Sequence, residues 1–231
     1  ADYYAQTRPI RATDTFFWQV DEQDWIHLNT IQYLPGSDSL VVSSRETSTV
    51  IKVDDVHGEA AVGWLCGDPA FWQGTGYEGY CLAPVGDFTW QYGQHSVAWA
   101  EGEEEGIGYL RMFNNNYWAL SSRDGYDPDL PDGVSTELYG GADDRSYTYV
   151  YRVDENAGTV ELVESFPVPY SSIVSNATLN EETGHWAVNS GISMLFGEYD
   201  ADGQLIRQYA YQCTMQGYRT FKYDYQGFWF Q

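Results

Sequence analysis

The chain has 231 residues, of which 43% are hydrophobic and 17% aromatic, so it is long enough to bury a sizeable core of its own. With 34 acidic residues against 11 basic ones, its formal charge is −23, which excludes nucleic acids and anionic membranes as partners. An anionic substrate would have to be bound by local positive charge, which the nine arginines and two lysines can supply.

Short apolar runs recur from residue 26 onward and are joined by turn-forming residues, a pattern typical of antiparallel hairpins. We expect strands within residues 26–34, 39–53, 96–100, 108–113, 147–153, 160–166, 185–189, 194–199, 205–211 and 218–225. Hairpins begin near residues 26, 95, 147, 185 and 218, which suits four-stranded blades with long insertions. The sequence therefore predicts an all-β fold, with a β-propeller as the simplest architecture and a β-sandwich as the main alternative.

Two long insertions interrupt the pattern, at residues 67–93 and 121–145, and loops of this length are commonly functional or disordered. No domain boundary is visible, so residues 1–231 are interpreted as one partial propeller domain. Three to four blades are too few to close a ring. We therefore expect the N-terminal blades to be missing from this chain or to come from another polypeptide.

The cysteines and the acidic loops give weak signals for sites. Cys66 and Cys81 bracket a turn-rich loop that a disulfide could close, and unpaired thiols are the alternative. Asp127, Asp129 and Asp132 are similar to a calcium-binding loop, but their spacing is wrong by one residue. No stretch approaches the roughly 18 apolar residues that a membrane span needs. We expect no metal and no membrane span.

Polar residues interrupt the first predicted hairpin. His27 and Asn29 are two positions apart, so they share one face of a strand. Arg45 ends the returning strand and lies opposite His27 only if the connecting loop has an odd number of residues. A histidine, an amide and a guanidinium that converge at one end of a sheet would bind an oxyanion well. The alternative is a surface arginine and a core histidine.

His95 follows an aromatic segment, residues 88–92, and begins another predicted strand. A neutral imidazole there could act as a nucleophile or a base near neutral pH. His57 and His185 have no second polar partner on their strands, so we interpret them as surface or packing residues.

Three short motifs occur in a fixed order: D-W-x-H-x-N-x-I at residues 24–31, S-x-R at residues 43–45 and Q-H at residues 94–95. In these motifs the chain resembles the bacterial PAPS-independent arylsulfate sulfotransferases. Further similarity at residues 109–115 and 218–223 extends the resemblance through nearly the whole chain. Because this family folds as a six-bladed β-propeller, the resemblance implies that the chain supplies the C-terminal three to four blades.

The resemblance also implies a mechanism. His95 would be the nucleophile that becomes sulfurylated, while His27, Asn29 and Arg45 would bind and polarise the sulfuryl oxygens. The donor would be an aryl sulfate and the acceptor a phenol, in a two-step, ping-pong route that needs no metal or nucleotide cofactor. A further active-site histidine of the family lies in an earlier blade, so we expect the chain to need an N-terminal partner segment.

The resemblance leaves several points open. Asn114 stands where the family has an aspartate, and we expect it to shape a turn. We expect an exported protein, whether periplasmic, secreted or at the cell surface, and a homo-oligomer stays open. Candidates for an aryl pocket are Trp25, Trp72, Tyr80, Trp90 and Tyr92.

Two other functions remain as alternatives. A non-catalytic propeller could bind carbohydrate or protein through its tryptophan and tyrosine surface. A glycosidase would need a pair of carboxylates, and no spacing among the 34 acidic residues singles out such a pair.

Overall fold

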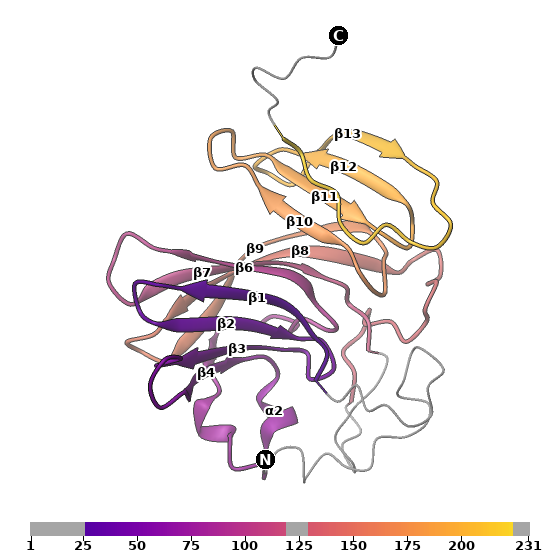
Figure 1. Cartoon of the computed structure of the whole chain (residues 1–231). Helices are drawn as coiled ribbons and strands as arrows, with labels where there is room; N and C mark the ends of the chain where they lie inside the picture. Colours follow the sequence, from indigo (N-terminus) through magenta and orange to yellow (C-terminus); the bar gives the residue numbers. More distant parts are fainter. Residues whose placement is uncertain (1–25, 119–128, 224–231) are drawn as a thin grey trace.

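The computed structural model describes residues 26–118 and 129–223, and almost every regular element in these ranges is a β-strand. The strands form three sheets, each built around four strands that are consecutive in the chain (Figure 1). The prediction of an all-β fold is confirmed.

The first sheet contains four strands that pair antiparallel in chain order. They are β1 (Leu28–Leu34), β2 (Ser39–Ser44), β3 (Thr49–Asp54) and β4 (Ala61–Cys66). Valine, isoleucine and threonine are frequent in β2 and β3, and such β-branched residues favour a pleated, buried surface.

The second sheet is again an antiparallel series, with one short parallel strand added at its outer edge. The series is β6 (His95–Glu101), β7 (Ile107–Asn114), β8 (Arg145–Asp154) and β9 (Thr159–Pro169), and the added strand is β5 (Ala83–Val85). The insertion before β6 also contains helix α2 (Pro69–Trp72) and a 3₁₀ turn (Glu78–Tyr80).

The third sheet repeats the antiparallel order of the first. It consists of β10 (Asn176–Leu179), β11 (Trp186–Ser190), β12 (Leu195–Tyr199) and β13 (Leu205–Ala210). The predicted hairpin starts near residues 26 and 95 fit the first strands of the first two sheets. The predicted start near 147 lies in β8, after the long insertion that separates β7 from β8 within one sheet, and the start near 185 lies at β11, one strand after the first strand of its sheet. The strand predicted within residues 218–225 was wrong for its described part, because residues 218–223 form no strand.

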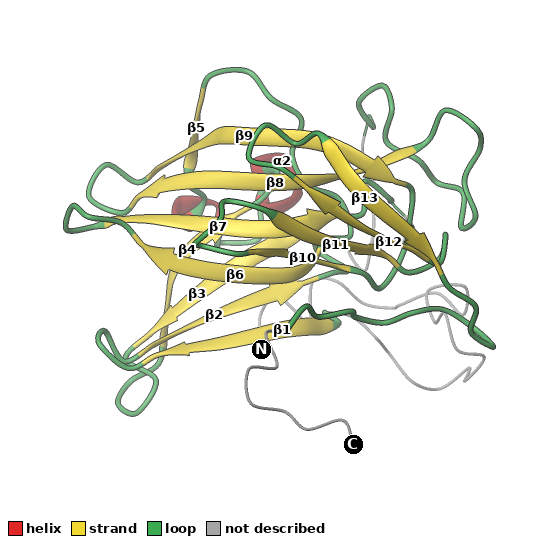
Figure 2. Cartoon of the chain, turned by 90° about the horizontal axis from the view of Figure 1, so that it is seen from above, coloured by secondary structure: helices red, strands yellow, loops and turns green. Residues whose placement is uncertain are grey.

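The first strands of the three sheets lie next to one another. β6 contacts both β1 and β10, so the sheets are arranged side by side, as Figures 1 and 2 show. One hydrophobic core joins the first and second sheets, with Trp64 packed near Trp99, and another joins the second and third, with Phe166 against Trp186. Three sheets that pack in succession are blades of a β-propeller, and the sandwich alternative is wrong.

The cysteines, the helices and the acidic residues concern three smaller features of the chain. Cys66, Cys81 and Cys213 are all free thiols, and burial raises the pKa of Cys81 to about 11. No helix within the described ranges is long and apolar enough to cross a membrane.

Asp127, part of the calcium-like loop, lies outside the described residues. The residues that are described contain no group of three or more histidine, cysteine or acidic side chains suited to a metal ion.

Candidate functional site

Arg45 lies opposite His27 because of a β-bulge at Asn29. The loop between β1 and β2, residues 35–38, has an even number of residues. An even loop by itself would place Arg45 on the other face of the sheet from His27. The register shifts by one residue at Asn29, and the Arg45 backbone N–H donates to the His27 carbonyl at 3.2 Å. The bulge thus restores the pairing that the loop length would have prevented.

The first strand of each blade begins with strained backbone. His27 has a φ of 44°, Ser96 a φ of 57° and Ser175 a φ of 87°. Positive φ is uncommon for residues other than glycine, and such strain, on the order of 1–3 kcal/mol each, clusters at functional sites. The ends of β1, β6 and β10 where these residues lie are therefore the part of the molecule where a site is expected.

The hydrogen bonds of His95 fix its tautomer. Its Nδ1 lies 3.0 Å from the Gly93 carbonyl and 2.8 Å from Asn115 Oδ1. The Asn115 amide nitrogen faces the Ser171 and Val174 carbonyls at 2.7 and 3.1 Å, so its oxygen must face His95. Since both neighbours of Nδ1 are acceptors, Nδ1 carries the proton and Nε2 carries the lone pair.

His95 is also held in its neutral form. It is buried, and burial lowers its pKa to about 3, with the nearby charges of Arg45 and His27 acting in the same direction. The bonds to Asn115 and Gly93 oppose this shift only in part. A neutral imidazole with a free Nε2 is the nucleophilic form of histidine.

A second set of hydrogen bonds joins Asn29 to the segment that carries His95. Asn29 Nδ2 donates to the Gln94 carbonyl at 2.7 Å. The Gln94 side chain in turn donates to Ser43 Oγ and to the Ser44 carbonyl, both at 3.1 Å. The first and second blades are therefore tied together beside His95, and the structure brings all four predicted site residues to one end of two adjacent blades.

Several polar atoms at this end have unused hydrogen-bonding capacity, among them one atom each of Arg45 and Asn29. Arg45 is buried, and its Nη1 pairs with the carboxylate of Glu46, while its Nε has no partner within the described ranges. Asn29 Oδ1 is likewise buried without a partner there. Because a buried polar atom without a partner costs about 1–3 kcal/mol, such atoms indicate a place where a ligand can bind.

Sequence reasoning missed Glu46 and Asn115. Asn115 accepts the bond from His95, whereas Asn114 accepts from the backbone N–H groups of Tyr92 and Asn116 and so shapes a turn, as expected. The run of three asparagines was the available signal, but the strand end had to be known before one of them could be assigned to His95.

A model of the arylsulfotransferase family matches residues 2–224. The chain belongs to this family. No curated protein gives a match.

Several solved structures are also similar to this arylsulfotransferase-family chain. The WD40 domain of coronin from Toxoplasma gondii is 11% identical with a TM-score of 0.39, over 80% of this chain and 35% of that one. Hsv2 from Kluyveromyces lactis is 13% identical with a TM-score of 0.27, over 79% and 50%. Virginiamycin B lyase from Staphylococcus aureus is 10% identical with a TM-score of 0.30, over 84% and 72%. The chain thus spans about a third of the coronin domain and half of Hsv2.

The aromatic residues suggested for an aryl pocket of this arylsulfotransferase-family protein mostly serve the core. Trp72 and Tyr92 are buried, and Trp90 packs against Phe88 in the first core. Tyr80 is exposed, and Trp25 lies outside the described residues. The sequence did not single out Tyr117, which is buried. Burial raises the pKa of this tyrosine, and the nearby charge of Arg45 opposes that shift.

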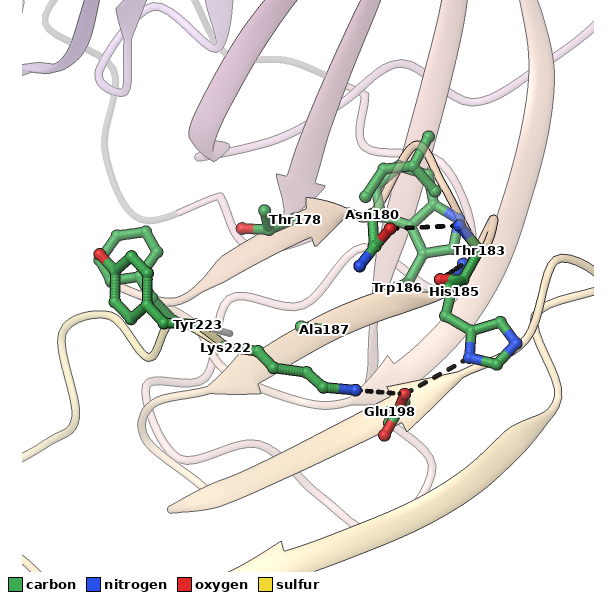
Figure 3. A pocket seen from close by; sticks show the side chains of 11 residues that line it. Thr178, Asn180, Thr183, His185, Trp186, Ala187, Glu198, Lys222 and Tyr223 are labelled. Atoms are coloured by element: carbon green, nitrogen blue, oxygen red, sulfur yellow. Dashed lines mark hydrogen bonds and ion pairs between the residues drawn. The ribbon is translucent and has the colours of Figure 1, made fainter. Parts of the chain in front are cut away.

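A separate pocket lies between the third blade and the segment that follows it (Figure 3). Glu198 there binds Lys222 at 2.7 Å and His185 at 3.4 Å, and these partners, Lys222 foremost, lower its pKa. None of the four predicted site residues lines this pocket, and its charges neutralise one another. The blade ends around His95 therefore remain the candidate site of this family member.

Proposed function

We propose that this chain carries most of the active site of an arylsulfate sulfotransferase, which moves a sulfuryl group from an aryl sulfate to a phenol through a sulfohistidine. Membership in the arylsulfotransferase family supports the reaction class. The observation that carries the proposal is the His95 imidazole, which is kept neutral with its Nε2 lone pair free beside the Arg45 charge.

In the first step, His95 Nε2 attacks the sulfur of the aryl sulfate, and the bond from sulfur to the phenolic oxygen breaks. The electron pair of that bond leaves with the phenolate, which takes a proton from solvent. The Nδ1–H of the sulfurylated ring keeps its bonds to Asn115 and Gly93, which stabilise the positive charge that develops on the ring.

In the second step, the oxygen of an acceptor phenol attacks the same sulfur and the N–S bond breaks, which returns the electron pair to His95 Nε2. The phenol proton is released to solvent, so atoms and charge balance over the cycle. Negative charge stays on the sulfuryl oxygens in both steps, and in this proposal the Arg45 guanidinium, which also pairs with Glu46, stabilises it through the unpartnered Nε. His27 and the second N–H of Asn29 complete the set of donors in this proposal.

The proposal includes a partner segment. The described sheets provide three blades, and a six-bladed ring of the kind that the resemblance implies needs three more. An N-terminal segment of the same protein supplies them, and the protein acts outside the cytoplasm on small phenolic substrates.

Turnover of a chromogenic aryl sulfate with phenol as acceptor tests this function in the complete protein. The His95→Ala variant should lose at least about a thousandfold in kcat with its melting temperature retained, because no nucleophile remains. His57→Ala is the matched control, since His57 is an exposed residue that binds Asp38 at the opposite end of the first blade. Unchanged turnover in His95→Ala would refute the proposal, and absence of turnover in the wild type would favour a binding propeller.

A further inference from the structure

Arg219 lies in the segment that follows β13, and both of its neighbours are fixed to the third blade. The Ser175 N–H donates to the Tyr218 carbonyl at 3.0 Å. The Asn176 side chain pairs twice with Thr220, accepting from its N–H at 2.8 Å and donating to its carbonyl at 2.9 Å. The backbone at Arg219 is therefore held at the start of β10.

The side chain of Arg219 reaches from there to the first blade. Its Nη2 donates to the Asn29 carbonyl at 2.9 Å and lies 3.5 Å from Thr30 Oγ1, across 190 residues of chain. Figure 2 shows the segment after β13 returning toward β1. Because β6 lies between β1 and β10, this guanidinium links the two blades on either side of the strand that His95 begins.

The charge of Arg219 is not neutralised by a carboxylate. Within residues 26–118 and 129–223, Arg111 pairs with Glu181 and Arg45 with Glu46, whereas Arg219 donates only to a carbonyl and a hydroxyl. Its Nε is buried and has no partner in those ranges. Arg145 and Arg207 also lack a carboxylate partner there, but both are exposed. The buried, unpartnered Nε is what sets Arg219 apart as a place for an external anion in a chain with a net charge of −23.

Asn29 connects Arg219 to the reacting histidine. The carbonyl that Arg219 binds belongs to the bulge residue, and the side chain of Asn29 holds the carbonyl of Gln94, next to His95. The charges that lower the pKa of His95 are those of Arg45 and His27. Arg219 therefore acts on the site through Asn29 and not on the imidazole itself.

We propose that Arg219 is a positioning residue for sulfuryl transfer, which holds the Asn29 bulge in register and favours the anionic aryl sulfate by its uncompensated charge. This inference rests on the proposed function. A loss of the guanidinium should weaken binding of the anionic donor more than it slows the chemical step.

The test compares Arg219→Gln and Arg219→Lys in the complete protein. Arg219→Gln should raise the KM for the aryl sulfate about tenfold while kcat falls no more than about threefold, since charge and register are lost but His95 remains. Arg219→Lys should raise KM only about threefold, because an ammonium can replace Nη2 at the Asn29 carbonyl but cannot supply the donor at Nε. Arg207→Gln on β13, an exposed arginine that binds Tyr209, removes the same charge and should leave both constants unchanged.

A double-mutant cycle with Asn29→Ala tests the route of the effect. In the Asn29→Ala variant, which lacks the side-chain amide, Arg219→Gln should raise KM by less than half of the factor by which it raises KM in the wild type. Kinetic constants of Arg219→Gln equal to those of Arg207→Gln would overturn the role of Arg219 and leave the proposed function standing. If Arg219→Gln does not fold, wild-type constants in Arg219→Lys would overturn it instead. Absence of turnover in the wild type would overturn both proposals.

Discussion

At the scale of single residues, the site depends on which atoms of His95 are occupied. Two acceptors at Nδ1 leave Nε2 as the only ring nitrogen that can attack, and burial removes the competing proton. The sequence singled out His27, Asn29, Arg45 and His95 as candidates, because polar residues interrupt apolar strands there, and the family resemblance gave these residues their proposed roles. It was insufficient to predict Asn115, whose role depends on the direction of one amide group.

The pH dependence of turnover should report the neutral state of His95. Because its pKa is about 3, the acid limb of kcat/KM should lie below about pH 4 if His95 controls it. Asn115→Asp places a carboxylate beside Nδ1, which stabilises the imidazolium and raises the pKa of His95, so the acid limb should move up by roughly 1–3 pH units. Asn156→Asp makes the same change on an exposed turn and should leave the limb in place. An Asn115→Asp profile identical to that of the wild type would contradict the assigned tautomer.

At the scale of elements, the position of His95 depends on the turn that precedes β6. Gly93 has a φ of 64°, and a Cβ there would lie 2.7 Å from the Tyr117 carbonyl oxygen. The Gly93 carbonyl is also one of the two acceptors of His95. The sequence predicted strands close to the starts of β1 and β6, but not this close approach or the bulge at Asn29, because both are set by contacts between neighbouring strands.

Gly93→Ala should therefore lower both stability and activity. The backbone conformation alone costs about 1 kcal/mol for an alanine, and the contact with the Tyr117 carbonyl adds to it, for a total of roughly 2–4 kcal/mol of unfolding free energy. Gly158→Ala is the matched control, since Gly158 has a φ of 66° and a Cβ there meets nothing within 4 Å. The free energy of unfolding, measured by chemical denaturation, and kcat should both fall further in Gly93→Ala than in Gly158→Ala. If the two variants lost equal amounts of stability and of kcat, close packing at Gly93 would not be what positions His95.

At the scale of the whole molecule, three blades meet so that β6 contacts both β1 and β10, with Arg45 and Arg219 at the end where these strands begin. The acidic surface would repel a sulfate ester at long range, and Arg45 and Arg219 provide the local exception there. The composition predicted the all-β fold, which the structure confirms. The blade boundaries could not be read correctly, because one insertion falls inside the second blade and imitates a boundary.

The most direct test is to capture the covalent intermediate. The complete protein is incubated with an aryl sulfate and no phenol, digested, and analysed by mass spectrometry for a peptide that has gained one sulfuryl group. We predict that the group is found on His95, that it disappears when phenol is added, and that His95→Ala shows no such peptide. A sulfuryl group on another residue, or turnover without any modified peptide, would contradict the account.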